Sequence, residues 1–162
     1  MKKLLLILAA CAVLTSCNSC ESIKKIWSAG TVSVSAQTAD KIIIDAQKAA
    51  QIGETTFNTF LKLEYDNRDA YMQISPEIHK KAEWLREKVP DPTQIILPGE
   101  PPTISIPRGV AILKVERKAT KIFQANRTED GKANLMTAYR TLMSTIDDVK
   151  RIQSLALAGG NP

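Results

Sequence analysis

Residues 39–74 of this chain read ADKIIIDAQKAAQIGETTFNTFLKLEYDNRDAYMQI. Apolar and small residues recur in this stretch every three or four positions, a spacing that gathers them on one face of an α-helix. The members of this face are Ile42, Ala46, Ala49, Gly53, Thr56, Phe57, Phe60, Leu63, Tyr71 and Ile74. Because no proline interrupts the stretch, the sequence predicts one long amphipathic helix, and with it an all-α fold.

Small residues cluster in the middle of this predicted helix. Gly53 costs about 1 kcal/mol relative to alanine inside a helix, so its presence calls for a compensating contact. Ala46, Ala49 and Ala50 lie nearby, and we therefore expect another helix to approach closely at this patch. Asn67 falls on the same stripe, where its side chain either fixes the register between packed helices or lies at the surface.

A second helix is predicted from Pro76 to about Lys88. Ser75-Pro76-Glu77 combines a capping serine, a proline that needs no hydrogen-bond partner and an acid at the positive helix end. The buried stripe of this helix is predicted to be Ile78, Ala82, Leu85 and Val89, and Pro90 ends it. His79 lies off the stripe beside two lysines and is expected to be a solvated surface residue.

Residues 90–107 contain six prolines, which exclude a helix. Two short strands, 94–97 and 103–106, are predicted on either side of a proline-glycine turn. Loops of this length in compact domains are often functional, so the segment is the best candidate partner-binding feature. Its candidate residues are Ile95, Leu97, Ile104 and Ile106. The alternative interpretation is a structural clip whose isoleucines pack on the helices.

The helical period returns in two further segments. The first, 109–126, is predicted to turn Ile112, Val115, Ala119, Ile122 and Phe123 inward. Its outer face carries Lys114, Arg117, Lys118 and Lys121, which we interpret as solvated helix surface in preference to a lipid or phosphate site.

A polar turn at 127–131 leads into the last predicted helix, which Gly159 and Gly160 end. Its apolar stripe is predicted to be Leu135, Met136, Tyr139, Leu142, Met143, Ile146, Val149, Ile152 and Leu155. Helices joined by short turns lie antiparallel. The sequence therefore predicts an up-down bundle of three to four helices, with a short proline-rich hairpin or loop between the second and third helices.

The N-terminus has the order of an export signal. Lys2 and Lys3 precede an apolar run, 4–14, that is too short to span a bilayer stably. The tetrad Leu14-Thr15-Ser16-Cys17 resembles the lipobox of bacterial lipoproteins. The resemblance covers only the first tenth of the chain. It implies cleavage before Cys17 and lipidation of that cysteine with diacylglycerol and an amide-linked acyl chain such as palmitate.

Together with the composition of 18–36 and the predicted helices, this resemblance divides the chain into a signal peptide, 1–16, a lipid-anchored tether, 17–36, and a helical domain, 37–158. It places the protein in the cell envelope, facing the periplasm, and Asn18 after the lipidated cysteine favours the outer membrane over the inner. The Cys17–Cys20 spacing matches a redox pair only by accident, because no βαβ pattern follows it. Cys20 is then either free or an intermolecular crosslink.

Three residues of the tether suit a membrane surface. Lys24 and Lys25 would meet anionic lipid, and Trp27 would lie in the headgroup region. The alternative is that Ile23, Ile26 and Trp27 pack on the body as the first turn of a helix. No transmembrane span beyond the signal is expected.

Composition argues against nucleic acid as a partner. The chain has 22 Lys and Arg against 17 Asp and Glu, and loss of Lys2 and Lys3 leaves 20 against 17, a net charge of about +3. The basic residues are interspersed with acids, and aromatic residues are 5% of the chain, too few for base-stacking platforms.

Motifs for catalysis are missing from the sequence. One histidine cannot complete a zinc shell with the cysteines, no serine lies in a nucleophile elbow, and no glycine-rich phosphate loop occurs. We expect no cofactor, no metal and no enzyme activity.

The function expected is a lipid-anchored binding or structural module with an unidentified envelope protein as partner. The alternatives are an envelope enzyme, an inhibitor of one, or a phage-encoded lysis or superinfection factor. The last rests on a likeness in size and architecture to small helical lipoproteins of phages and prophages, which no residue motif carries.

Overall fold

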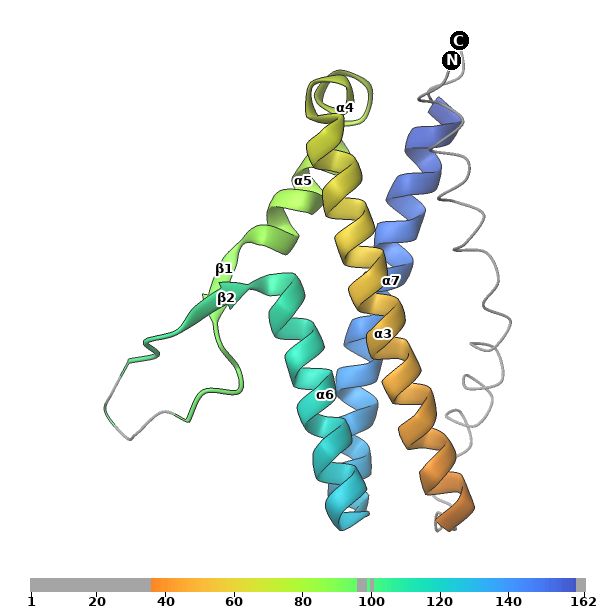
Figure 1. The fold of residues 1–162 in the computed structure, drawn as a ribbon, viewed down its shortest axis with the longest axis vertical. Helices are drawn as coiled ribbons and strands as arrows, with labels where there is room; N and C mark the ends of the chain where they lie inside the picture. Colours follow the sequence, from red (N-terminus) through yellow and green to blue (C-terminus); the bar gives the residue numbers. More distant parts are fainter. Residues whose placement is uncertain (1–35, 96–98, 100, 160–162) are drawn as a thin grey trace. The chain divides into compact units, whose positions relative to one another are not determined.

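The computed structural model describes residues 36–95, 99 and 101–159. Its elements, labelled in Figure 1, are α3 (Ala36–Asp66), α4 (Arg68–Ile74), α5 (Pro76–Arg86), β1 (Lys88–Pro90), β2 (Ser105–Pro107), α6 (Arg108–Asn126) and α7 (Glu129–Gly159). The described part is mostly helical, and its strands form one antiparallel pair. The prediction of an all-α fold is confirmed.

The start of α6 lies in space next to the end of α5, although residues 87–107 separate them in the sequence. The backbone N–H of Arg108 donates to the Glu87 carbonyl at 2.8 Å. Gly109 packs so closely on Leu85 that an added Cβ would lie 3.4 Å from its Cδ2 atom and 3.6 Å from its carbonyl oxygen. The two helices therefore follow one another end to end beside α3 and α7, and the described residues of the segment 88–107, here called the arm, project from the junction (Figure 1).

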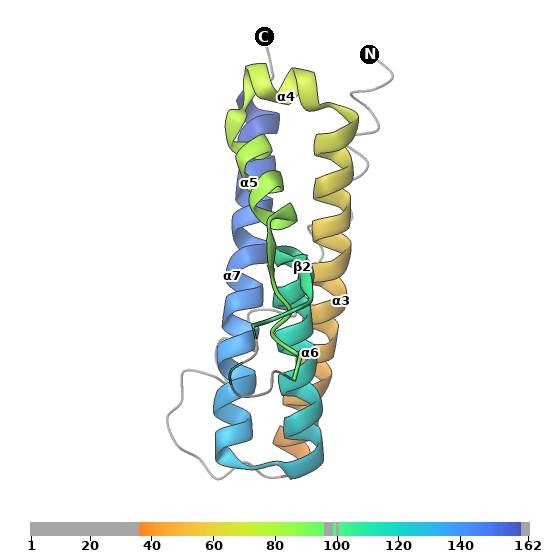
Figure 2. The same ribbon diagram turned by 90° about the vertical axis from the view of Figure 1, so that its left-hand side faces the viewer.

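Helices α3, α6 and α7 pack on one another along their lengths, while α4 crosses from the end of α3 to the start of α5 (Figure 2). The largest apolar side chains that are almost fully buried come from α3, α5, α6 and α7: Phe60, Leu85, Phe123, Leu135, Leu142, Ile146 and Val149. Gly53 lies among them. A Cβ added there would approach Leu142 Cδ1 to 2.8 Å and Leu113 Cδ2 to 3.2 Å, so the expected close helix approach at Gly53 is confirmed.

The predicted single helix over 39–74 is wrong near its end. It breaks at Asn67, whose backbone has φ −132° and ψ 25° and whose side-chain amide donates to the Leu63 carbonyl at 3.0 Å. An asparagine that bonds the backbone in this way competes with the helical ladder. Asn67 thus ends α3 and lets α4 change direction.

The end of α5 also differs from the sequence prediction, and Val89, predicted for its buried stripe, is half-buried in β1. Helix α5 does start at Pro76, but the Ser75 side chain makes no cap hydrogen bond. The helix stops at Arg86 and not near Lys88, because Lys88–Pro90 forms β1. Its predicted buried residues Ile78, Ala82 and Leu85 are confirmed.

The predicted inward face of α6 is wrong in register. Ala119 and Phe123 are buried as expected, but Val115 and Ile122 are 39% and 44% exposed, and Ile112 is half-buried. The buried stripe that starts at the junction with α5 has spacings of four, three, four and three residues: Gly109, Leu113, Glu116, Thr120 and Phe123. In this rotation Gly109 packs on Leu85 and Leu113 packs on Gly53 of α3, and the carboxyl group of Glu116 lies in the core.

The last helix follows its predicted stripe for most of its length. Its confirmed buried residues are Leu135, Tyr139, Leu142, Ile146, Val149 and Ile152. Met136 and Met143 are half-buried, and Leu155, predicted to be inward, is 58% exposed.

Replacing Phe60 with alanine tests the core. Phe60 is 1% exposed, so Phe60→Ala should lower the free energy of unfolding by about 3–5 kcal/mol, measured by urea denaturation followed by far-UV circular dichroism. Tyr65→Ala, at a position 73% exposed on the same helix, is the matched control and should change it by about 0.5 kcal/mol or less. Equal effects of the two changes would contradict the assigned core.

Candidate functional site

The arm leaves the body as a short antiparallel ladder. Val89 lies opposite Ile106, Lys88 opposite Pro107 and Pro90 opposite Ser105. The predicted first strand, 94–97, is therefore misplaced, since Gln94 and Ile95 belong to no strand and residues 96–98 lie outside the described part. Pairing occurs at 88–90 because the stacking of α5 on α6 brings positions 88 and 107 together.

Asp91 fastens the base of the arm to α6. Its carboxylate is 6% exposed and accepts hydrogen bonds from the Lys114 ammonium at 2.6 Å and from the Thr93 hydroxyl and N–H at 2.7 Å and 2.9 Å. Its own N–H donates to the Ile104 carbonyl at 2.9 Å. The Lys114 ammonium, followed by the Thr93 donors, lowers the pKa of Asp91 to about 2. The carboxylate is thus ionised at neutral pH and holds the arm in place.

A side-chain amide bridges the two sides of the arm further out. Gln94 donates through Nε2 to the Thr103 hydroxyl at 2.6 Å, and its Oε1 atom accepts from the Ile104 N–H at 3.1 Å. The amide replaces the ladder bonds that a longer pair of strands would make. The sequence contained a signal for the Asp91 turn, since an aspartate two residues before a threonine favours such local hydrogen bonds.

The candidate partner-binding isoleucines differ in exposure. Ile95 is 90% exposed and Ile104 is 50% exposed, whereas Ile106 is half-buried in β2. Leu97 lies outside the described residues. Neither Ile95 nor Ile104 is buried against the helices, which contradicts the clip interpretation for these two side chains. Their contact with a partner stays a prediction.

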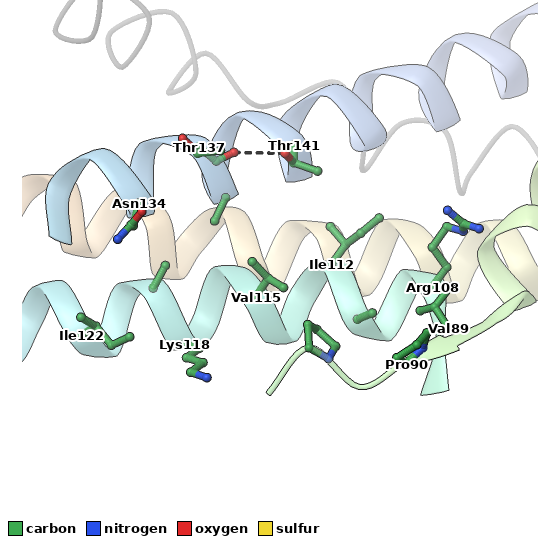
Figure 3. A pocket seen from close by; sticks show the side chains of 14 residues that line it. Val89, Pro90, Arg108, Ile112, Val115, Lys118, Ile122, Asn134, Thr137 and Thr141 are labelled. Carbon is green, nitrogen blue, oxygen red and sulfur yellow. Dashed lines mark hydrogen bonds between the residues drawn. The ribbon is translucent and has the colours of Figure 1, made fainter. Parts of the chain in front are cut away.

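Beside the arm, a groove of about 620 Å³ runs between α6 and α7 (Figure 3). The wall from α6 is mainly apolar: Ala111, Ile112, Val115, Lys118, Ala119 and Ile122. The wall from α7 consists of Asn134, Thr137, Ala138 and Thr141, and Val89, Pro90, Pro92 and Arg108 close one end. The hydroxyls of Thr137 and Thr141 donate to carbonyls of their own helix at 3.1 Å, so the groove has few polar groups that seek a partner.

The predicted basic face of α6 divides into two pairs. Lys114 is bound to Asp91, and Arg117 pairs with Glu54 of α3 at 2.5 Å. Lys118 and Lys121, by contrast, have no carboxylate within 4.0 Å among the residues that the structure describes. Lys118 lines the groove, and Lys121 lines a neighbouring hollow that shares Lys118 and Ile122 with it.

A second cluster of charges joins α3, α4 and α5. The Glu64 side chain is fully buried, and its Oε1 atom lies 2.8 Å from His79 Nδ1 and 3.1 Å from Arg68 Nε. Its Oε2 atom lies 2.7 Å from the Arg86 guanidinium, which also reaches Glu83. The expectation that His79 is a solvated surface residue is therefore wrong. Position 64 lies four residues after Phe60, on the buried stripe of α3, and that spacing was the available signal.

Burial alone would raise the pKa of Glu64, but the hydrogen bonds from His79, Arg86 and Arg68 outweigh it and lower the pKa below its ordinary value. All charges in the cluster face one another across three helices. The arrangement ties the turn between α3 and α5 to the body, which is a structural task, although a histidine oriented by a carboxylate also occurs in acid–base sites.

A third buried carboxyl, that of Glu116, has the opposite character. Its Oε1 atom accepts from the Thr120 hydroxyl at 2.7 Å, and Oε2 has no hydrogen-bond partner in the described part of the chain. Burial raises the pKa of this carboxyl, and the hydrogen bond from Thr120 and the charge of Arg117 offset the rise only in part. This carboxyl shows no access to a substrate, and its position reflects the rotation of α6.

Other sequence-derived candidates lie outside the described residues. These are the lipidation site Cys17 and the membrane-surface residues Lys24, Lys25 and Trp27. Within the described ranges, no group of three or more histidine, cysteine or acidic side chains is placed to hold a metal ion. No helix there combines the length and apolar character needed to cross a bilayer.

No protein-family model, curated protein or solved structure matches this chain.

Replacing Glu64 with glutamine tests the charge cluster. Because the folded pKa is lowered, ionised Glu64 contributes stability that is present above its unfolded value of about 4.5 and is lost as the pH falls through the folded value. Glu64→Gln should therefore destabilise the fold by about 1–3 kcal/mol at pH 7 and flatten the loss of stability on acidification. Glu83→Gln, at a half-exposed position of the same cluster, should cost about 1 kcal/mol or less. An unchanged acid profile in the Glu64 variant would contradict this assignment.

Replacing Ile95 and Ile104 together with threonine tests whether the arm supports the fold. Both side chains are exposed, so the melting temperature should fall by no more than about 2 °C. The same chemical change at the buried Ile146 is the control, and it should lower the melting temperature by about 2–4 °C for each kcal/mol lost. A similar fall in both proteins would restore the clip interpretation.

Proposed function

We propose that this protein is a lipid-anchored module of the bacterial cell envelope that binds another envelope protein. The observation that carries the binding role is Ile95, 90% exposed on an arm whose base is braced by Asp91 and Lys114. The anchor rests on the tetrad that ends at Cys17. In this proposal, lipid at Cys17 holds the protein to the periplasmic side of a membrane, with the outer membrane favoured.

The arm is much longer than a connection between α5 and α6 requires. The Arg108 N–H already meets the Glu87 carbonyl at 2.8 Å, so a short turn would suffice at this junction. The chain instead extends over residues 88–107, orders part of that segment through Gln94, and leaves isoleucine side chains in water. Exposed apolar side chains on a braced loop are characteristic of recognition surfaces.

The arrangement of the body also belongs to this proposal. We interpret α3, the stacked pair α5 and α6, and α7 as the three members of an up-down bundle, with the proline-rich hairpin inserted in the middle member. Such a scaffold holds a loop rigidly without contributing chemistry of its own. Lys24, Lys25 and Trp27 would lie between the anchor and this scaffold, next to the lipid headgroups.

Changing Cys17 to alanine tests the anchor. The variant should lose incorporation of labelled palmitate and move from the membrane to the soluble fraction, because each buried CH₂ of a lipid chain contributes about 0.8 kcal/mol of membrane affinity. Cys20→Ala, three residues away, should keep both the label and the membrane association. A Cys17→Ala protein that stays in the membrane without label would refute the proposed anchor.

A further inference from the structure

Helix α6 has one buried stripe and a second, apolar stripe that the fold leaves partly exposed. This outward stripe consists of the half-buried Ile112 and the exposed Val115 and Ile122. A rotation of α6 by one residue, about 100°, would bury Val115 and Ile122 and expose the carboxyl of Glu116. The protein does the reverse, with Glu116 at 0% exposure and Ile122 at 44%. The described fold thus leaves the apolar side chains Val115 and Ile122 partly exposed.

The outward stripe forms one wall of the groove between α6 and α7. A groove between two packed helices can bind a third helix, because the side-chain ridges of the third helix fit between those of the other two. The groove has a volume of about 620 Å³, and side chains from both helices line it (Figure 3). A helix placed there would turn the local set of α3, α6 and α7 into a four-helix arrangement.

Charge indicates the chemistry of that helix. Lys118 lines the groove and Lys121 lies one turn further along α6, and neither has a carboxylate partner among the described residues. Arg108 closes the end of the groove near the arm. We propose that the groove between α6 and α7 binds a helix of a partner protein that is apolar on one face and acidic along the edge beside Lys118 and Lys121.

Two other occupants fit the groove less well. A second copy that docked through the same groove would supply no carboxylate for Lys118, because the residues that line the groove include no Asp or Glu. A lipid bilayer is flat, whereas the apolar side chains Ile112 and Ala119 lie within a concave surface between two helices. A helix with its own ridge of side chains reaches them.

This inference rests on the binding role proposed above and not on the lipid anchor.

The test uses the purified full-length chain and a synthetic helical peptide with leucines on one face and glutamates along its edges. Fluorescence anisotropy should show saturable binding that weakens with added salt. A peptide with lysines in place of the glutamates should bind at least about tenfold more weakly.

Variants of the protein locate the binding. Val115→Glu and Lys118→Glu should each weaken binding of the acidic peptide by about tenfold or more. Ile44→Glu and Lys48→Glu make the same changes at exposed positions of α3 and should leave binding within about twofold. Far-UV circular dichroism checks that each variant is folded.

Several outcomes would overturn the proposal. These are the absence of binding, equal binding of the two peptides, and equal binding to wild type and to Val115→Glu. Self-association that depends on Val115, measured by sedimentation, would assign the groove to a second copy. Binding to phosphatidylglycerol vesicles without binding to the peptide would assign it to a membrane. A failed Cys17→Ala experiment would remove the anchor and leave the result on the groove intact.

Discussion

The end-to-end contact of α5 with α6 is the constraint on which the rest of this structure depends. It consists of one backbone hydrogen bond at 2.8 Å, the close packing of Gly109 on Leu85, and the Arg108 guanidinium 5.0 Å from the centre of the Trp84 ring. A Cβ added at position 109 would lie 3.4 Å from Leu85 Cδ2 and 3.5 Å from Phe57 Cδ2, which are ordinary van der Waals contacts, so the helix ends are in contact without glycine being required there. The contact occurs in one particular rotation of α6, and that rotation decides which of its faces enters the core.

Three consequences follow from the rotation of α6. It carries Glu116 inward, where burial raises the pKa of the carboxyl. It places Lys114 within 2.6 Å of Asp91, which fixes the base of the arm. It also turns Val115 outward, together with the rest of the second apolar stripe. Glu64 differs from Glu116 in its hydrogen-bond partners. Both side chains are 0% exposed, but donors from His79, Arg86 and Arg68 lower the pKa of Glu64.

Periodicity in the sequence predicted the elements whose single apolar stripe faces the core. It identified the buried face of α3 around Gly53 and most of that of α7, as well as the start of α5 at Pro76. It failed for α6 because two stripes, about 100° apart, compete there, and local spacing does not choose between them. The choice depends on packing against other helices, such as that of Leu113 on Gly53 of α3. The predicted position of the first strand was wrong for a similar reason. Residues 88–90 pair because the helix ends bring them next to 105–107, and not because of their β-propensity.

The arm and the groove share residues and therefore present one continuous surface. Val89 and Pro92 belong to the arm and also line the groove, and Asp91, between them, is bound to Lys114 of α6. A partner helix in the groove would thus touch the base of the arm. Because the Asp91 N–H also holds the Ile104 carbonyl, the position of Ile104 is tied to that of α6 and not only to its own loop. If a partner contacts both Ile104 and the groove, as proposed, these hydrogen bonds would already hold the two together, and binding would carry less of the entropic cost of ordering a free loop.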